Sequence, residues 1–340
     1  MGLLVAGDVM LSRNVRHRIA GIAASLQALK SSFPGCALVA NLESPVCTAP
    51  LRYQNGFRAD PGECKEILRM FDVLSVANNH AMDCGVEGLE ETVAFLKGLG
   101  IQVVGYRGSE GKQNGAVITI GDTKVGIVGY VERALLVEEP PSILATCSDL
   151  SLVQKEIGSI REQSDITVCI LHAGSEMTRF PSKAERALPR RLVEMGVTVV
   201  IRSHAHVIQG CERLESSLVL YGLGDFIFDS SVRRRRTGAL AHITVEDSRI
   251  SVRHVLVRRD TDHNPLISGS YGDLPSVPDS WQKPRQIIDR LTYYCERTAD
   301  LISTYGMRGV AYVIRRIARA MMSGFRLRSS GREGLTRFRI

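Results

Sequence analysis

The stretch Val197-Thr198-Val199-Val200-Ile201-Arg202-Ser203-His204-Ala205-His206 joins a run of β-branched apolar residues to a pair of histidines. Such a run predicts a buried strand. The i, i+2 spacing of His204 and His206 places both imidazoles on one face of the extended segment that follows. Ligands bind at the carboxyl ends of the strands in open α/β sheets. The stretch therefore predicts an inner strand that presents two metal ligands at this edge.

Four other apolar runs also end in residues that can bind a metal. They lie at residues 3–6, 37–40, 72–77 and 166–171, and the residues that follow them are Asp8, Asn41, Glu43, Asn78, Asn79, His80, His172 and Glu176. Oxygen and imidazole ligands without a thiolate are typical of Mn, Fe, Zn or Mg centres. The ligands are too many for one tetrahedral ion, so we expect two divalent metal ions (Mn, Fe or Zn) joined by a bridging carboxylate.

Apolar runs and helical patterns alternate along most of the chain, and this alternation predicts an α/β layer architecture. The expected strands are residues 3–6, 37–40, 72–77, 101–104, 116–119, 124–129, 166–171, 197–201, 218–221, 239–245 and 249–257. Apolar residues at i, i+3 and i+4 predict helices near residues 20–31, 62–70, 86–98, 150–161 and 183–195.

The composition changes after Asp262, where four prolines lie among Gly and Ser within residues 264–284. This pattern is typical of a linker. Helical patterns return near residues 285–303 and 308–325. We therefore expect three parts, which are a domain of residues 1–258, a Pro-rich linker of residues 259–284 and a basic helical C-terminal extension of residues 285–340.

The basic character of the chain lies in this extension. Residues 265–340 hold 13 Lys and Arg against 6 Asp and Glu, which accounts for the whole formal net charge of +7. On a helix over residues 308–325 the apolar and arginine side chains fall on different sides, which predicts peripheral contact with an anionic membrane surface. The alternative is a helix packed on the domain with its arginines in water. A neutral domain without a recognition motif argues against nucleic-acid binding.

The cysteines and the apolar runs indicate the compartment. Eight cysteines are scattered without any C-x-x-C pair, and free thiols of this kind are typical of a reducing environment. No run of 18 apolar residues predicts a membrane-spanning helix. Residues 1–8 reach a carboxylate at once, which predicts a first strand rather than a signal peptide. We expect a cytoplasmic protein with peripheral contact at the inner membrane surface.

The order of the motifs resembles the CapA family, which is associated with poly-γ-glutamate capsule synthesis and belongs to the metallophosphoesterase superfamily. The resemblance covers about residues 1–258 and rests on Gly7-Asp8, Asn41-Leu42-Glu43, Ala77-Asn78-Asn79-His80, His172-Ala173-Gly174-Ser175-Glu176, His204-Ala205-His206 and Tyr221-Gly222-Leu223-Gly224-Asp225-Phe226. It implies a four-layer αββα sandwich of two sheets flanked by helices.

The resemblance also implies a role for each matching residue. Asp8 and His206 hold one metal in this scheme. The other metal is held by Asn79, His172 and His204, and Glu43 bridges the two. His80 matches the histidine that protonates the leaving group. Asp83 either orients His80 or caps the helix near residues 86–98.

The sequence departs from the resembled patterns at four positions. Met10 stands where the superfamily's first motif has a histidine, so one metal site is either weaker, empty or completed by Glu176. Ala173 replaces a usual tryptophan, Arg202 a usual glycine, and Asp225 a usual asparagine. These changes concern the choice of substrate more than the metal site.

Four residues are candidate contacts for an anionic substrate, namely Arg13, Arg58, Arg202 and Asp225. For the arginines, the alternative is a side chain in solvent. The run Arg233-Arg234-Arg235-Arg236 is either a patch for a polyanion or a solvated loop near the mouth of the site.

The motifs together predict a metal-dependent hydrolase that acts on an anionic small molecule or polymer. Metal-activated water would attack phosphorus or a carbonyl carbon while His80 supplies a proton. The superfamily resemblance favours phosphoester hydrolysis, whereas the association with capsule polymers favours an amide. A third alternative is a binding or assembly subunit of a surface-polymer machine with a degenerate metal site, which Met10 motivates.

Overall fold

The computed structural model describes residues 2–108, 114–230, 232–246, 249–268, 272, 276 and 277. Half of the predicted linker and the whole predicted C-terminal extension, residues 285–340, lie outside the described residues.

The first sheet has eight strands, five of which run parallel to one another, and it carries the N-terminal half of the site. Its order is β14-β13-β12-β1-β2-β3-β4, and β11 pairs with the end of β1. The strands are β1 (Leu3–Val9), β2 (Ala37–Leu42), β3 (Val73–Ser75), β4 (Gln102–Val104), β11 (Asp225–Ile227), β12 (Thr237–Glu246), β13 (Arg249–Arg259) and β14 (Pro265–Ile267).

The second sheet has six strands in the order β5-β6-β7-β8-β10-β9. They are β5 (Ala116–Ile120), β6 (Thr123–Val131), β7 (Ile166–His172), β8 (Val199–Ser203), β9 (Ile208–Leu214) and β10 (Ser217–Leu223). The central strands β6, β7, β8 and β10 are parallel and almost wholly buried, as expected for a sheet that is covered on both faces.

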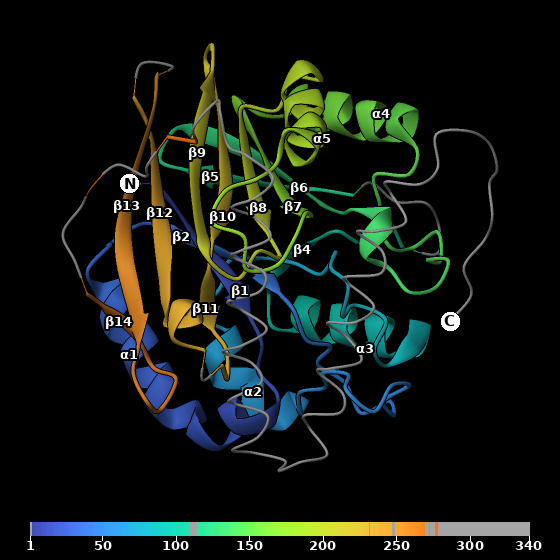
Figure 1. The fold of residues 1–340 in the computed structure, drawn as a ribbon, viewed down its shortest axis with the longest axis vertical. Helices are drawn as coiled ribbons and strands as arrows, with labels where there is room; N and C mark the ends of the chain where they lie inside the picture. Colours follow the sequence, from blue (N-terminus) through green and yellow to red (C-terminus); the bar gives the residue numbers. More distant parts are fainter. Residues whose placement is uncertain are drawn as a thin grey trace, which may run out of the picture. The chain divides into compact units, whose positions relative to one another are not determined.

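Helices cover the outer face of each sheet, so the domain has four layers (Figure 1). The helices are α1 (Ile19–Ser31), α2 (Pro61–Leu68), α3 (Gly85–Gly98), α4 (Leu150–Arg161) and α5 (Lys183–Glu194). One apolar cluster packs α1, α2 and α3 against the first sheet, a second packs α4 and α5 against the other sheet, and a third fills the space between the sheets. The predicted αββα sandwich is confirmed.

Short 3-10 helices complete the described elements, and three strands were not predicted. The 3-10 helices are η1 (Arg13–Arg18), η2 (Arg133–Leu135) and η3 (Arg233–Arg236). The unpredicted strands are β9, β11 and β14. Strands β9 and β14 lie at sheet edges and are only partly buried, so their sequences lack a continuous apolar run. Strand β14 begins at Pro265, a residue that an edge strand tolerates. Residues 265–267 of the predicted linker therefore extend the first sheet.

No helix among the described residues is both long enough and apolar enough to cross a membrane.

Candidate metal centre

The alternation of side chains along each strand decides which strand-end residues face the space between the sheets. In β2, Val39 packs between the sheets while Leu38 and Ala40 face the helices. The same alternation directs Asn41 and Glu43 toward the second sheet. In β7, Val168 and Ile170 pack between the sheets, so His172 is directed toward the first sheet.

A bulge at Gly7 turns Asp8 into the same space. Leu4 and Ala6 face the helices, and an unbroken alternation would send Asp8 there as well. The pairing of β1 with β2 instead gains one residue between Val5 and Asp8, which reverses the faces. Gly7 permits this geometry, because a Cβ there would lie 1.8 Å from the carbonyl oxygen of Gly224.

Side chains from the two sheets meet directly at the carboxyl edge. Across the two sheets, Asn79 Oδ1 lies 2.7 Å from His172 Nε2. Within the first sheet, Asn41 Nδ2 donates to Asp8 Oδ1 at 2.9 Å. The backbone N–H of His204 points at Asp8 Oδ2 at 3.4 Å. The structure therefore brings together all six residues that were predicted as first choices for metal binding, namely Asp8, Glu43, Asn79, His172, His204 and His206.

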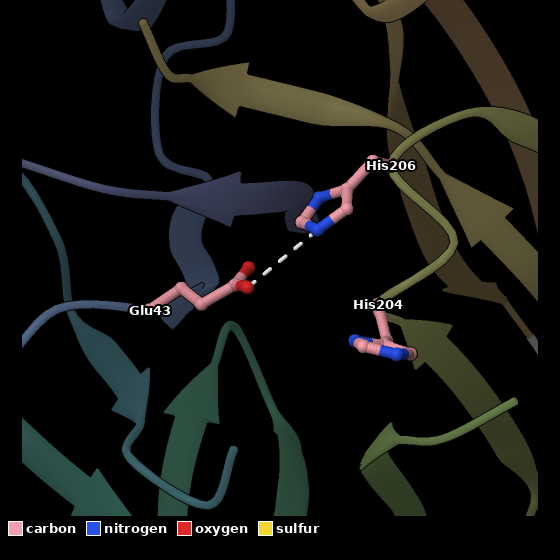
Figure 2. A group of neighbouring side chains, drawn as sticks. All are labelled: Glu43, His204 and His206. Atoms are coloured by element: carbon pink, nitrogen blue, oxygen red, sulfur yellow. Dashed lines mark ion pairs between the residues drawn. The ribbon is translucent and has the colours of Figure 1, made fainter. Parts of the chain in front are cut away.

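Glu43 lies at the middle of this group, and neither of its carboxylate oxygens accepts a hydrogen bond from the described residues. Its side chain is completely buried. His206 Nε2 lies 3.6 Å from Glu43 Oε1 (Figure 2), and the Nδ1 atom of His204 is also buried without a partner. Buried polar atoms are rarely left unpaired, so these atoms fit a bound cation.

Three overlapping sets of side chains have the geometry to hold an ion. Each set places one ligand atom per residue within 4.8 Å of the others, and the sets are Glu43, His204 and His206; Asp8, Glu43 and His172; and Asp8, His206 and Asp225. Glu43 and Asp8 occur in two sets each. The donors are oxygen and imidazole nitrogen only, which suits a divalent Mn, Fe or Zn ion.

Burial sets the protonation of His172 and His204. It lowers the pKa of His172 well below its ordinary value, and it lowers the pKa of His204 to about 4. Both imidazoles are therefore neutral at pH 7 and can donate a lone pair to a metal. At His206 burial acts to lower the pKa, but the charges of Glu43 and Asp225 outweigh burial and raise the pKa. Burial raises the pKa of Glu43, as expected for a carboxylate that lacks a cation.

Backbone strain coincides with the histidine pair. His204 and His206 have φ angles of 85° and 57°, a left-handed conformation that costs free energy in residues with a side chain. The loop between β8 and β9 thus positions both imidazoles on a backbone of unfavourable conformation. Strain of this kind is typical of functional sites.

His80 lies at the open side of the centre. Its Nδ1 atom is 2.7 Å from Asp83 Oδ2 and its Nε2 atom is 4.0 Å from Glu43 Oε1. The ring stacks on Phe57 at 4.0 Å between centroids. Its side chain is 23% exposed, whereas that of Glu43 is 1% exposed. Asn79, His80 and Asp83 line a cleft of about 320 Å³, so a substrate can approach from this side.

The predicted substrate contacts occupy different places. The Arg13 guanidinium lies over the Phe57 ring at 4.3 Å, and His80 stacks on the same ring. Arg58 lines a separate cavity and donates to the carbonyl oxygen of Ala49 at 3.3 Å. Arg202 is completely buried and donates to the carbonyl oxygen of Tyr221 at 3.0 Å. Asp225 is also completely buried. Arg202 and Asp225 therefore face protein groups rather than the cleft.

Met10 stands at the position of a usual histidine ligand, and Glu176 is the residue that was predicted, as one alternative, to complete the metal site instead. Met10 is buried, and its sulfur accepts the Ser12 hydroxyl at 3.0 Å. Glu176 is half-buried, and its negative charge acts on His204.

Sequence reasoning gave no individual role to four polar residues around the centre, although it named Asn41 among the strand-end residues. Asn41 and Ser203 bind the predicted ligands, because Ser203 Oγ lies 2.8 Å from His172 Nδ1. Both stand at strand ends, a signal that was present. Arg235 and Arg259 bind Asp225. Arg235 was hidden in an arginine run that was interpreted as a surface feature, and nothing in the local sequence singles out Arg259.

The fold and the site define a four-layer α/β protein with a buried cluster of oxygen and imidazole ligands. Residues 2–230 match the family described as bacterial capsule synthesis protein PGA_cap. The chain belongs to this family.

Curated relatives carry related names. The chain is 29% identical to the PGA biosynthesis protein CapA of Bacillus subtilis (strain 168), over 69% of this chain and 65% of that protein. It is 26% identical to the capsule biosynthesis protein CapA of Bacillus anthracis, over 55% and 47% of the two chains. A probable polyglutamine synthesis accessory protein of Mycobacterium tuberculosis is 28% identical over 46% and 45%. The matches thus span about half to two thirds of these relatives.

The fold recurs in a solved structure. A hypothetical protein from Thermus thermophilus superposes with a TM-score of 0.52 at 16% identity, over 76% of this chain and all of the other.

Proposed function

We propose that this protein is a metal-dependent hydrolase that cleaves a phosphoester in the synthesis of a capsule or poly-γ-glutamate-like polymer. The observation that carries the proposal is Glu43, a fully buried carboxylate whose two oxygens have no hydrogen-bond partner among the described residues. It lies among Asp8, His172, His204 and His206, so a pair of divalent ions bridged by Glu43 would satisfy these atoms.

Bound metal ions would supply Lewis acidity and a water molecule of lowered pKa. The residues of the chain then hold and orient the substrate and a proton. Because Asp83 binds His80 Nδ1, the Nε2 atom of His80 faces the centre and can give a proton to the oxygen of a leaving group. Arg13 lies over the Phe57 ring, on which His80 also stacks, and in this proposal it would meet a negative charge on the substrate.

A second candidate is a non-catalytic subunit of a polymer-synthesis complex, or one directed at an amide. The Mycobacterium tuberculosis relative is named as an accessory protein, and that name favours this alternative. Metal-dependent turnover of an aryl phosphate separates the two candidates. A purely structural subunit would show no turnover, and an amide-directed subunit would not act on a phosphoester.

The first test is metal content by elemental analysis of protein purified without chelator. We expect about two equivalents of Mn, Fe or Zn in the wild type and a loss of both in the His204→Ala/His206→Ala variant. The matched control is His17→Ala, because His17 is exposed and lies outside the centre. The metal-loaded wild type should hydrolyse an aryl phosphate. A wild-type protein that binds no metal even after reconstitution would refute the hydrolase.

A further inference from the structure

Asp225 connects the candidate metal centre to two buried arginines. Its Oδ1 atom lies 2.8 Å from His206 Nδ1, and its Oδ2 atom accepts from Arg235 Nε at 2.7 Å. Arg259 Nη2 lies 3.4 Å from the same Oδ2 atom. All four side chains are nearly inaccessible to solvent, so these contacts form in a medium of low dielectric constant, where they are strong.

Further contacts hold the two guanidinium groups in place. Arg259 also donates to the carbonyl oxygens of Phe228 and Arg235. The Arg235 guanidinium lies over the Phe228 ring at 4.3 Å, and the same ring packs edge-on against His206 at 5.2 Å. The network therefore fixes His206 through the hydrogen bond with Asp225 and through the ring contact with Phe228.

Asp225 is the carboxylate that faces both guanidinium groups. Its Oδ2 atom forms ion pairs with Arg235 at 2.7 Å and with Arg259 at 3.4 Å, and all three side chains are buried. The removal of one member leaves a buried charge without full compensation.

We propose that Asp225, Arg235 and Arg259 are positioning residues that fix His206 as a ligand through its Nε2 atom. The proposal rests on the metal centre proposed above. Asp225 itself lies within reach of a metal held by Asp8 and His206. However, its Oδ1 atom already binds His206, and its Oδ2 atom already binds both arginines.

The hydrogen bond determines which nitrogen of His206 is free. His206 Nδ1 lies 2.8 Å from Asp225 Oδ1 and 3.2 Å from Asp8 Oδ2, so a proton on Nδ1 is held by carboxylates. The Nε2 atom, which faces Glu43 Oε1 at 3.6 Å, is the nitrogen that can bind a metal. A carboxylate on the far nitrogen of a metal-binding histidine fixes the ring and its tautomer, and its loss typically weakens metal binding about 10–100-fold. The resembled motif has an asparagine at the position of Asp225.

The first test is the affinity of the protein for Co²⁺ alone, measured by calorimetry and by the visible spectrum of the bound ion. We expect Arg235→Gln, Arg259→Gln and Asp225→Asn each to weaken binding about 10–100-fold. The control is Arg258→Gln, because Arg258 is the exposed neighbour of Arg259 on β13 and should leave binding unchanged. Arg235→Lys keeps the charge and should weaken binding less than Arg235→Gln.

A second readout needs no metal. Long-range proton–nitrogen NMR of the metal-free protein should show a proton on His206 Nδ1 in the wild type, and this proton should be less protected from exchange with solvent in Asp225→Asn. Thermal melts identify any variant that fails to fold. If Arg235→Gln fails to fold, Arg235→Lys replaces it in the comparison. Variants that melt at lower temperature but keep the wild-type protection of this proton and the wild-type Co²⁺ affinity would overturn the proposal, as would a wild type that binds no Co²⁺. Turnover plays no part in these readouts, so a metal-loaded but inactive protein would refute only the hydrolase.

Discussion

The carboxylate of Asp83 joins two parts of the cleft, because its Oδ2 atom lies 2.7 Å from His80 Nδ1 and accepts the backbone N–H of Phe57 at 2.6 Å. The cap of α3 does not use this carboxylate, since the helix begins after Cys84 without a side-chain cap. Of the two roles predicted for Asp83, the contact with His80 is the one that the geometry supports.

Replacement of Asp83 by asparagine should therefore impair proton transfer and leave metal binding intact. The amide cannot hold the imidazole in the same tautomer, so we expect kcat for an aryl phosphate to fall about 10²-fold or more. His80→Asn should have a similar effect. Metal content should stay at the wild-type value in both variants. The control is Asp60→Asn, because Asp60 caps α2 and lies outside the centre. An Asp83→Asn enzyme with wild-type kcat would contradict the role of His80 as a proton donor.

Arg202 should matter for stability and not for the metal. Its guanidinium donates to the carbonyl oxygens of buried Tyr221 and part-buried Glu185 and to the side chain of buried Gln209. Arg202→Leu leaves these acceptors unpaired, and each buried unpaired group costs about 1–3 kcal/mol. Chemical denaturation should show this loss while metal content is unchanged. Arg191→Leu on the exposed face of α5 is the control, and a change in substrate KM without a loss of stability would restore the predicted substrate contact.

The N-terminus of α5 should lose stability in acid. Ser182 and Glu185 form a capping box. Burial acts to raise the pKa of Glu185, but the Ser182 N–H and the charge of Arg202 outweigh it, so the pKa lies below its ordinary value of 4.5. A carboxylate of lowered pKa stabilises the folded state above its ordinary pKa, and this contribution is lost as the pH falls below 4.5.

The variant that tests this is Glu185→Gln. At pH 7 it should unfold with a free energy lower by about 0.3–1.5 kcal/mol, and the difference from the wild type should shrink in acid. Denaturant titrations at several pH values measure both quantities. Glu194→Gln, at an exposed ion pair near the other end of α5, should change stability by less than about 0.5 kcal/mol at any pH. A difference for Glu185→Gln that persists unchanged at low pH would rule out the carboxylate as its origin.

The helix over residues 308–325 and its contact with a membrane stay predictions. We propose that this arginine-rich segment docks on an anionic membrane surface. Deletion of residues 305–340 should abolish co-sedimentation with vesicles that contain anionic lipid. High salt should weaken binding of the full chain, because the attraction is electrostatic. Undiminished sedimentation of the truncated protein would end this idea.

Much of the site follows from strand periodicity alone. The run Val197–Ile201 predicts β8, and the neighbouring histidines predict its function. Since alternate residues of a strand face opposite sides, Asn41, Glu43 and His172 could be assigned to the space between the sheets from their apolar neighbours. The same rule places Arg202 with Val200 on the helix side of β8. Its interpretation as a substrate contact did not apply this rule.

Only the tertiary structure decided the remaining features. The bulge at Gly7 that turns Asp8 inward depends on the close approach of β11, a strand that begins more than 200 residues later in the chain. The contact of Asn79 with His172 requires that two sheets pack face to face. Asp225 meets Arg235 and Arg259 only because β11, η3 and β13 converge behind His206. A local sequence determines the period and the faces of a strand, whereas its partners across the core are set by the packing of distant segments, which no local pattern records.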